Sequence, residues 1–120
     1  VLAANGGGGI INVLSIASWI TGPLLATYSA TKSAAWSLTN ALRQELSEQQ
    51  THVLGLHVGF IDTDLTNGMD VPKIAPNLVA ERTFDGLEQN AHQVLADEAT
   101  QQVHQALSSH PDIYLHALNH

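Results

Sequence analysis

Tyr28-Ser29-Ala30-Thr31-Lys32 begins an alanine-rich stretch, and the sequence predicts a helix over residues 28–48. Residues four apart on a helix project from the same face, so the Lys32 ammonium lies beside the Tyr28 phenol and favours its ionised form. Such a pair can move protons. A surface tyrosine resting on a lysine stem would show the same spacing, so the neighbouring segments must decide between the two interpretations.

The segments on either side of this helix predict parallel strands. An apolar run over residues 10–14 ends at Ser15, and a second run over residues 52–58 leads into Gly59. Strands that alternate with helices pair in parallel and form an α/β sheet, and the length suits a single domain. The remaining pattern predicts a helix over residues 76–89, a strand over 93–96 and a helix over 98–107.

This order of elements closely resembles the short-chain dehydrogenase/reductase family. The family's signature is an Asn-x-Ser-Ser-type strand end, a Tyr-x-x-x-Lys helix and a Pro-Gly-x-x-x-Thr segment. The first and third parts correspond to Asn12-Val13-Leu14-Ser15 and to Val58-Gly59-Phe60-Ile61-Asp62-Thr63. Leu14 replaces a non-catalytic serine and Val58 replaces a proline that shapes the turn, so neither departure removes a reacting group.

The resemblance implies a Rossmann-like, doubly wound parallel sheet, of which this chain carries the C-terminal half. It implies an oxidoreductase that transfers a hydride between NAD or NADP and a small-molecule carbonyl or alcohol substrate. Ser15, Tyr28 and Lys32 match the family's catalytic residues one by one. The positions assigned to the cofactor by the resemblance are Tyr28, Lys32, Gly59, Ile61 and Thr63.

The resemblance also implies an assembly and a substrate pocket. In relatives, the helix that corresponds to residues 28–48 often forms the subunit contact, which implies a homodimer or homotetramer. The loops that usually border the substrate are rich in apolar side chains here, so an apolar pocket is expected. These side chains are Trp19, Leu24, Leu25, Leu65 and Met69.

The first half of the family's domain has no counterpart in this sequence. That half carries the glycine-rich phosphate turn, the residue that selects NAD or NADP, and an active-site asparagine. We therefore expect residues 1–120 to be one partial domain, a fragment or a truncated product. The run Gly6-Gly7-Gly8-Gly9 cannot replace the phosphate turn, because it precedes a strand and opens no helix. It predicts a tight turn after a helix end.

Charge and composition exclude several classes of partner. The formal net charge is -7 with only 4 basic residues, too few to neutralise a run of phosphates, so neither nucleic acid nor an anionic membrane is expected. The chain contains no cysteine, which excludes thiol chemistry and suits the cytoplasm. Neither a signal peptide nor an apolar run long enough to span a bilayer is recognisable.

Two other functions remain open at the level of sequence. One is a catalytically inactive fragment that acts at most as an oligomerisation module, which the missing phosphate turn favours. The other is a serine hydrolase built on Ser15 and a histidine, although no Gly-x-Ser-x-Gly elbow surrounds Ser15.

The histidines and the acidic pair after the second strand predict no metal site. His52 and His57 are an odd number of positions apart on a strand and therefore face opposite sides of the sheet. His116 and His120 have helical spacing but no third ligand nearby. Asp62 and Asp64 flank Thr63, and we interpret them as capping or solvated groups.

Overall fold

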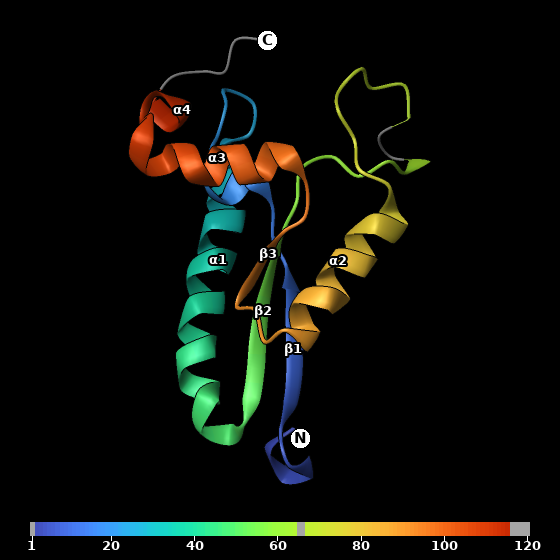
Figure 1. Cartoon of the computed structure of the whole chain (residues 1–120). Coiled ribbons are helices and arrows are strands. Elements are labelled where there is room, and N and C mark those ends of the chain that lie inside the picture. The colour runs from blue at the N-terminus through green and yellow to red at the C-terminus, as the bar shows by residue number, and fades with distance from the viewer. Residues whose placement is uncertain (1, 65–66, 116–120) are drawn as a thin grey trace.

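The computed structural model of the chain describes residues 2–64 and 67–115, and within these ranges three strands form one parallel sheet in the order β1, β2, β3 (Figure 1). Strand β1 spans Gly8–Val13, β2 spans Thr51–His57 and β3 spans Gln93–Leu95. The register places Gly8 opposite Thr51 and Val13 opposite Leu56. The predicted α/β class is confirmed, and the three strands and their helices match part of a Rossmann-like fold.

Helices connect the strands and cover both faces of the sheet. Helix α1 (Ala26–Leu46) links β1 to β2, and α2 (Pro76–Glu88) links β2 to β3 on the opposite side of the sheet in Figure 1. Helix α3 (Glu98–Ser109) and the short α4 (Asp112–Leu115) follow β3. The 3-10 turns that lie wholly within residues 2–64 and 67–115 are η1 (Ala3–Asn5), η2 (Ile16–Ser18) and η3 (Ser47–Gln49).

The predicted elements agree with these bounds to within about two residues, because apolar periodicity and the Pro76 start signal are strong in this sequence. None of the described helices is long and apolar enough to cross a membrane.

Strand β2 is the centre of the core. It has a neighbour on each side and helices on both faces, so six of its seven residues are buried. Such a strand reads as a nearly continuous apolar run, which is what made residues 52–58 recognisable. Its side chains pack with residues from α2 and β3; the buried cluster comprises Leu54, Leu56, Val58, Ile74, Val79 and Ala96.

Polar side chains fasten α1 to the sheet. Arg43 Nε donates to the backbone oxygen of Val53 (3.0 Å), and Arg43 Nη2 donates to that of His92 (2.8 Å). Asn12 on β1 donates to the hydroxyl of buried Thr39 (3.0 Å). These contacts set the helix at one position along β1 and β2, and hence set where its first turns lie.

The glycine run forms the predicted turn before β1. Gly6 and Gly7 have φ values of 88° and 99°, which L-residues with side chains rarely adopt. A Cβ on Gly7 would overlap the backbone oxygen of Gln50, and the N–H of Gly8 donates to that same oxygen (3.3 Å). Gly8 and Gly9 already belong to β1, so the run shapes a strand entry.

Within the described residues both edges of the sheet lack a further strand, β3 at one edge and β1 at the other. Strand β1 stands at one end of the strand order, so among the described residues its outer side pairs with no other strand.

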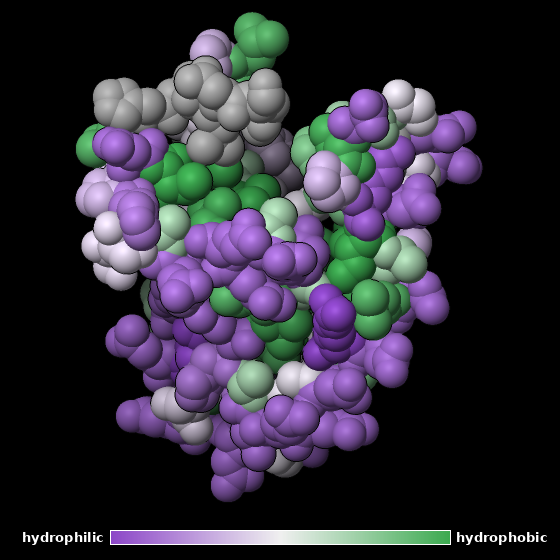
Figure 2. All heavy atoms as spheres, turned by 45° about the horizontal axis from the view of Figure 1, so that its top comes forward, coloured by the Kyte–Doolittle hydropathy of each residue, from purple (hydrophilic) through white to green (hydrophobic). Residues whose placement is uncertain are grey.

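Hydrophobic side chains also reach the surface near the loops that follow the strands. Figure 2 views the molecule with the top of Figure 1 brought forward, and there hydrophobic surface interrupts the hydrophilic side chains. Large apolar side chains exposed on the loops after β1 and β2 include Leu24, Leu25, Phe60 and Met69.

Candidate functional site

The Tyr28 and Lys32 side chains lie together near the carboxyl end of β1. The Lys32 ammonium is 5.8 Å from the centroid of the Tyr28 ring. It also donates a hydrogen bond of 3.4 Å to the backbone oxygen of Val13, the last residue of β1. The Tyr28 side chain is half exposed (50%) and can therefore meet a small molecule.

Ser15 follows β1 and is held rigidly. Its neighbours Leu14 and Ile16 donate backbone hydrogen bonds to Leu56 (2.6 Å) and Val58 (3.1 Å), which continue the pairing with β2 past the end of β1. Ser15 is only 8% exposed and caps η2, since its hydroxyl oxygen accepts the N–H of Ala17 at 3.0 Å. The hydroxyl proton remains available to a further acceptor.

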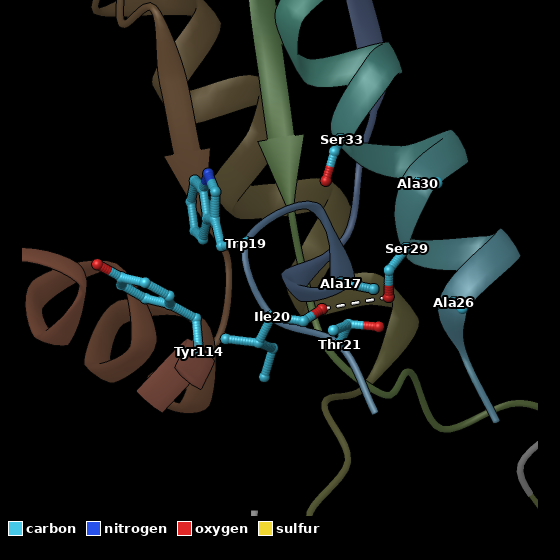
Figure 3. Close-up of a pocket in the computed structure, with 9 residues that line it drawn as sticks. All are labelled: Ala17, Trp19, Ile20, Thr21, Ala26, Ser29, Ala30, Ser33 and Tyr114. Atoms are coloured by element: carbon cyan, nitrogen blue, oxygen red, sulfur yellow. Dashed lines mark hydrogen bonds between the residues drawn. The ribbon is translucent and has the colours of Figure 1, made fainter. Parts of the chain in front are cut away.

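Two serines of α1 bind the η2 segment to the helix. Ser33 Oγ donates to the backbone oxygen of Ser18 (2.7 Å), and Ser29 Oγ donates to that of Ile20 (3.2 Å), the bond drawn in Figure 3. The segment that begins at Ser15 is therefore attached to the helix that carries the Tyr28–Lys32 pair.

A pocket of about 310 Å³ lies beside this attachment (Figure 3), and neither Tyr28 nor Lys32 is among the residues that line it. The pocket residues that belong to α1 recur at intervals of three or four positions and therefore share one face of the helix. This face is not the one that carries Tyr28 and Lys32. Of the predicted apolar border, Trp19 lines this pocket, whereas Leu24 is 97% exposed. Leu65 lies outside the described residues. The pocket residues are Ala17, Trp19, Ile20, Thr21, Ala26, Ser29, Ala30, Ser33 and Tyr114.

His57 is the last residue of β2, and from the sequence it was considered only as a possible metal ligand. It is 1% exposed and stacks on Trp19, with ring centroids 4.1 Å apart. Burial lowers the pKa of His57 to about 4; a backbone hydrogen bond with Ser15 opposes this shift, while His104 and Arg43 add to it. His57 is therefore neutral at neutral pH. Its place within a continuous apolar run was the available signal for burial.

The loop after β2 carries the predicted cofactor positions. Phe60 and Asp62 exchange backbone hydrogen bonds with Ile74 (3.0 and 2.8 Å), and Ile61 forms a parallel bridge with Ile74. The N–H of Gly59 donates to Asp97 Oδ2 at 3.0 Å. Thr63 is exposed. Hydrogen bonds thus hold the backbone of residues 59–62, and the cofactor contacts of Gly59, Ile61 and Thr63 stay predictions.

The histidines and acidic side chains of the described residues form no cluster. Among residues 2–64 and 67–115, no three His, Asp or Glu side chains are placed to share a metal ion. His52 Nε2 lies 2.6 Å from the backbone oxygen of Ala91, whereas the His57 ring stacks on Trp19. The two histidine side chains therefore have different neighbours. Asp62 and Asp64 are exposed. His116 and His120 lie outside the described residues.

Comparison with known proteins identifies the family. A family model described as short chain dehydrogenase matches residues 1–72. An uncharacterized oxidoreductase of Staphylococcus aureus (strain MW2) is 33% identical over 88 residues, which cover 71% of this chain and 38% of that protein.

Solved structures agree with this match. A short chain dehydrogenase from Burkholderia cenocepacia J2315, solved in complex with NADP, superposes with a TM-score of 0.84 and 34% identity. The superposition covers 92% of this chain and 46% of that one. A short chain dehydrogenase/reductase from Burkholderia phymatum, in complex with NAD, shares the fold with a TM-score of 0.70 at 20% identity, covering 91% of this chain and 51% of that one.

The chain thus spans less than half the length of the Staphylococcus and Burkholderia cenocepacia relatives. The family match covers more than half of this chain and includes Ser15, Tyr28, Lys32 and the predicted cofactor positions Gly59, Ile61 and Thr63. The chain belongs to the short-chain dehydrogenase family.

Proposed function

We propose that the protein to which this chain belongs is an NAD(P)-dependent oxidoreductase that acts on a small carbonyl or alcohol substrate. The observation that carries the proposal is the Tyr28–Lys32 pair, 5.8 Å from ammonium to ring, beside a strand end at which Ser15 is anchored on both flanks. This arrangement supplies a proton-transfer group, a cation and a hydrogen-bond donor at one end of a parallel sheet. Ligands of open α/β sheets bind at that end.

The described residues suit the nicotinamide end of such a cofactor. The loop after β2 lies at the same carboxyl edge as Ser15 and presents exposed Thr63 directly after the hydrogen-bonded backbone of residues 59–62. Tyr28, Lys32, Gly59, Ile61 and Thr63 would hold this part of the cofactor, and the bound nicotinamide supplies or accepts the hydride. Groups for the pyrophosphate are absent from this sequence, since its glycine run forms the entry to β1. The choice between NAD and NADP stays open.

The chain's own residues divide the proton chemistry among them. During reduction, the Tyr28 hydroxyl gives its proton to the substrate oxygen, and it takes the proton back during oxidation. The Lys32 ammonium stabilises the phenolate formed at Tyr28 and donates to a hydroxyl of the cofactor. The Ser15 hydroxyl donates to the substrate oxygen and holds it in line, because its own oxygen already accepts the N–H of Ala17.

A subunit contact through α1 is a further part of the proposal. Ala34, Leu38 and Ala41 are exposed at helical spacing and form an apolar stripe on the outer face of α1. Small residues allow close approach of a second helix, which supports a homodimer or homotetramer. The same stripe would serve a catalytically inactive oligomerisation module, the second candidate.

The test uses a chimaera in which this chain replaces the matching part of the Burkholderia cenocepacia dehydrogenase, which is 34% identical to it. Tyr28→Phe should lower kcat at least ~10²-fold and leave the Kd of NADPH or NADH nearly unchanged, because only proton transfer is lost. Lys32→Ala should impair both quantities. Steady-state kinetics with a set of ketones and alcohols gives kcat, and fluorescence titration gives Kd.

Thr31→Ala is the matched control, since it also removes an exposed hydroxyl from α1, but that hydroxyl donates to the backbone oxygen of Thr27 (2.9 Å). It should leave kcat and Kd unchanged. A Tyr28→Phe chimaera that retains nearly full activity would refute the role of Tyr28. A chimaera that binds subunits normally but neither cofactor nor substrate would favour the oligomerisation module.

A further inference from the structure

Asp97 connects two parts of the molecule with its two carboxylate oxygens. It follows β3 and caps α3: Oδ1 accepts the N–H of Thr100 at 3.3 Å and also the Thr100 hydroxyl. Oδ2 reaches in the other direction and accepts the N–H of Gly59 at 3.0 Å. Helix capping needs only one acceptor oxygen, so the second contact calls for a separate explanation.

The contact with Gly59 is built closely. A Cβ on Gly59 would lie 2.9 Å from Asp97 Oδ2, so a side chain there would displace the carboxylate. Asp97 is itself fixed through Ala96, whose N–H donates to the backbone oxygen of His57 (2.9 Å) and whose own oxygen accepts Arg82. A hydrogen bond to an ionised acceptor is stronger than a neutral one and holds its donor in a narrower range of orientations.

Gly59 lies two residues after the end of β2, in the loop that carries Ile61 and Thr63. Ile74 supports this loop at Phe60 and Asp62, so its middle is already held. The Asp97 contact holds the beginning, where the chain leaves β2 and its direction is set. Without it, the loop could pivot about the Ile74 pairing.

We propose that Asp97 is a positioning residue for the cofactor: by holding the N–H of Gly59, it orients Ile61 and Thr63 toward the nicotinamide. This inference rests on the proposed function for the identity of the ligand. Asp97 touches neither substrate nor cofactor, and acts only through the loop that contains Gly59.

The experiment compares Asp97→Asn with Thr100→Val in the same chimaera. Asparagine caps helices as well as aspartate does, but it has one acceptor oxygen. If that oxygen serves Thr100, the amide N–H₂ faces the N–H of Gly59 and the loop contact is lost. Thr100→Val removes the hydroxyl bond to Asp97 and leaves the Gly59 contact intact, so it controls for damage to the start of α3.

Two measurements are needed. Steady-state kinetics should show that Asp97→Asn raises the KM of the cofactor roughly tenfold with kcat within about twofold, whereas Thr100→Val leaves that KM unchanged. Hydrogen–deuterium exchange on the cofactor-free chimaera should show faster exchange over residues 59–63 in Asp97→Asn only.

An unchanged cofactor KM in Asp97→Asn overturns the inference, whatever happens to Tm. Equal KM increases in both variants also overturn it, since the effect would then come from α3. If the unsubstituted chimaera binds neither NADH nor NADPH, the proposed function falls and the role toward a cofactor falls with it. In that case, the rate of hydrogen–deuterium exchange over residues 59–63 still shows whether Asp97 holds the loop.

Discussion

His57 ties the stability of the fold to pH. Its pKa is lowered from 6.5 to about 4 by burial, so between these two values the unfolded chain binds a proton that the folded chain does not. With respect to His57, the free energy of unfolding should therefore be highest above about pH 6.5. It should decrease as the pH drops from there toward 4. The shift of about 2.5 pKa units corresponds to at most about 3.4 kcal/mol at 1.36 kcal/mol per unit. Urea unfolding of the chimaera between pH 7.5 and 4 measures this.

The control for this experiment is His57→Gln, which keeps a polar side chain but cannot titrate. It should be less stable at pH 7.5 and should show a shallower loss of stability toward pH 4. If both proteins lose stability in parallel, other groups cause the pH dependence.

At this scale, spacing along the chain predicted only local partners. Tyr28 and Lys32 are four apart on one helix, so their proximity followed from helix geometry. The contact of Asp97 with Gly59 spans 38 positions and depends on where β3 ends beside β2, which no local pattern encodes. The stacking of His57 on Trp19 was not predicted, because the two residues lie on different segments of the chain.

Among the elements, α2 contains a glycine that packing explains. A Cβ on Gly86 would overlap Val94 Cγ2 on β3, so the helix approaches the sheet closely at this point. Replacing glycine by alanine inside a helix normally stabilises it by up to about 1 kcal/mol. Here we expect Gly86→Ala to lower the free energy of unfolding by roughly 1–3 kcal/mol, because overpacking outweighs helix propensity. Thermal and urea unfolding of the chimaera would measure it.

Val94→Ala in the Gly86→Ala background provides the matched test, since it removes the methyl group that the new Cβ meets. The double variant should recover part of the loss. A Gly86→Ala protein that is more stable than its parent would show that α2 can shift without cost.

The extent of the elements was largely predictable, and their irregular connections were not. Apolar runs and Pro76 marked the strands and α2 to within about two residues. The η2 turn and the Ile61–Ile74 bridge were not predicted. Both are held by hydrogen bonds between residues that are far apart in the sequence, such as Ser33 with Ser18 and Asp62 with Ile74.

The whole molecule has an open side at β1. This strand is uncharged, and its outer backbone groups have no strand partner within the described residues. Such an edge favours pairing with another chain. We expect the 120-residue chain alone to self-associate or unfold, and to show no saturable binding of NADH or NADPH. Light scattering coupled to size exclusion and fluorescence titration test both statements, and micromolar binding by a monodisperse monomer would contradict them.

The order of the three strands was not predicted from the sequence. Alternation of strands and helices predicts parallel pairing, yet it does not say which strand lies in the middle. The one local sign of a central strand was the nearly continuous apolar run of β2, which agrees with the burial of nearly all of its residues.

The turn at Gly7 complicates how random substitutions in this protein would be interpreted. Gly7 precedes β1, whereas the Tyr28–Lys32 pair lies at the opposite, carboxyl end of that strand. Its positive φ and the adjacent Gln50 oxygen exclude any side chain without a rearrangement. A survey that scores activity alone would therefore rank Gly7 beside Tyr28. Cellular abundance separates the two, because loss at Gly7 removes the folded protein whereas loss at Tyr28 removes turnover.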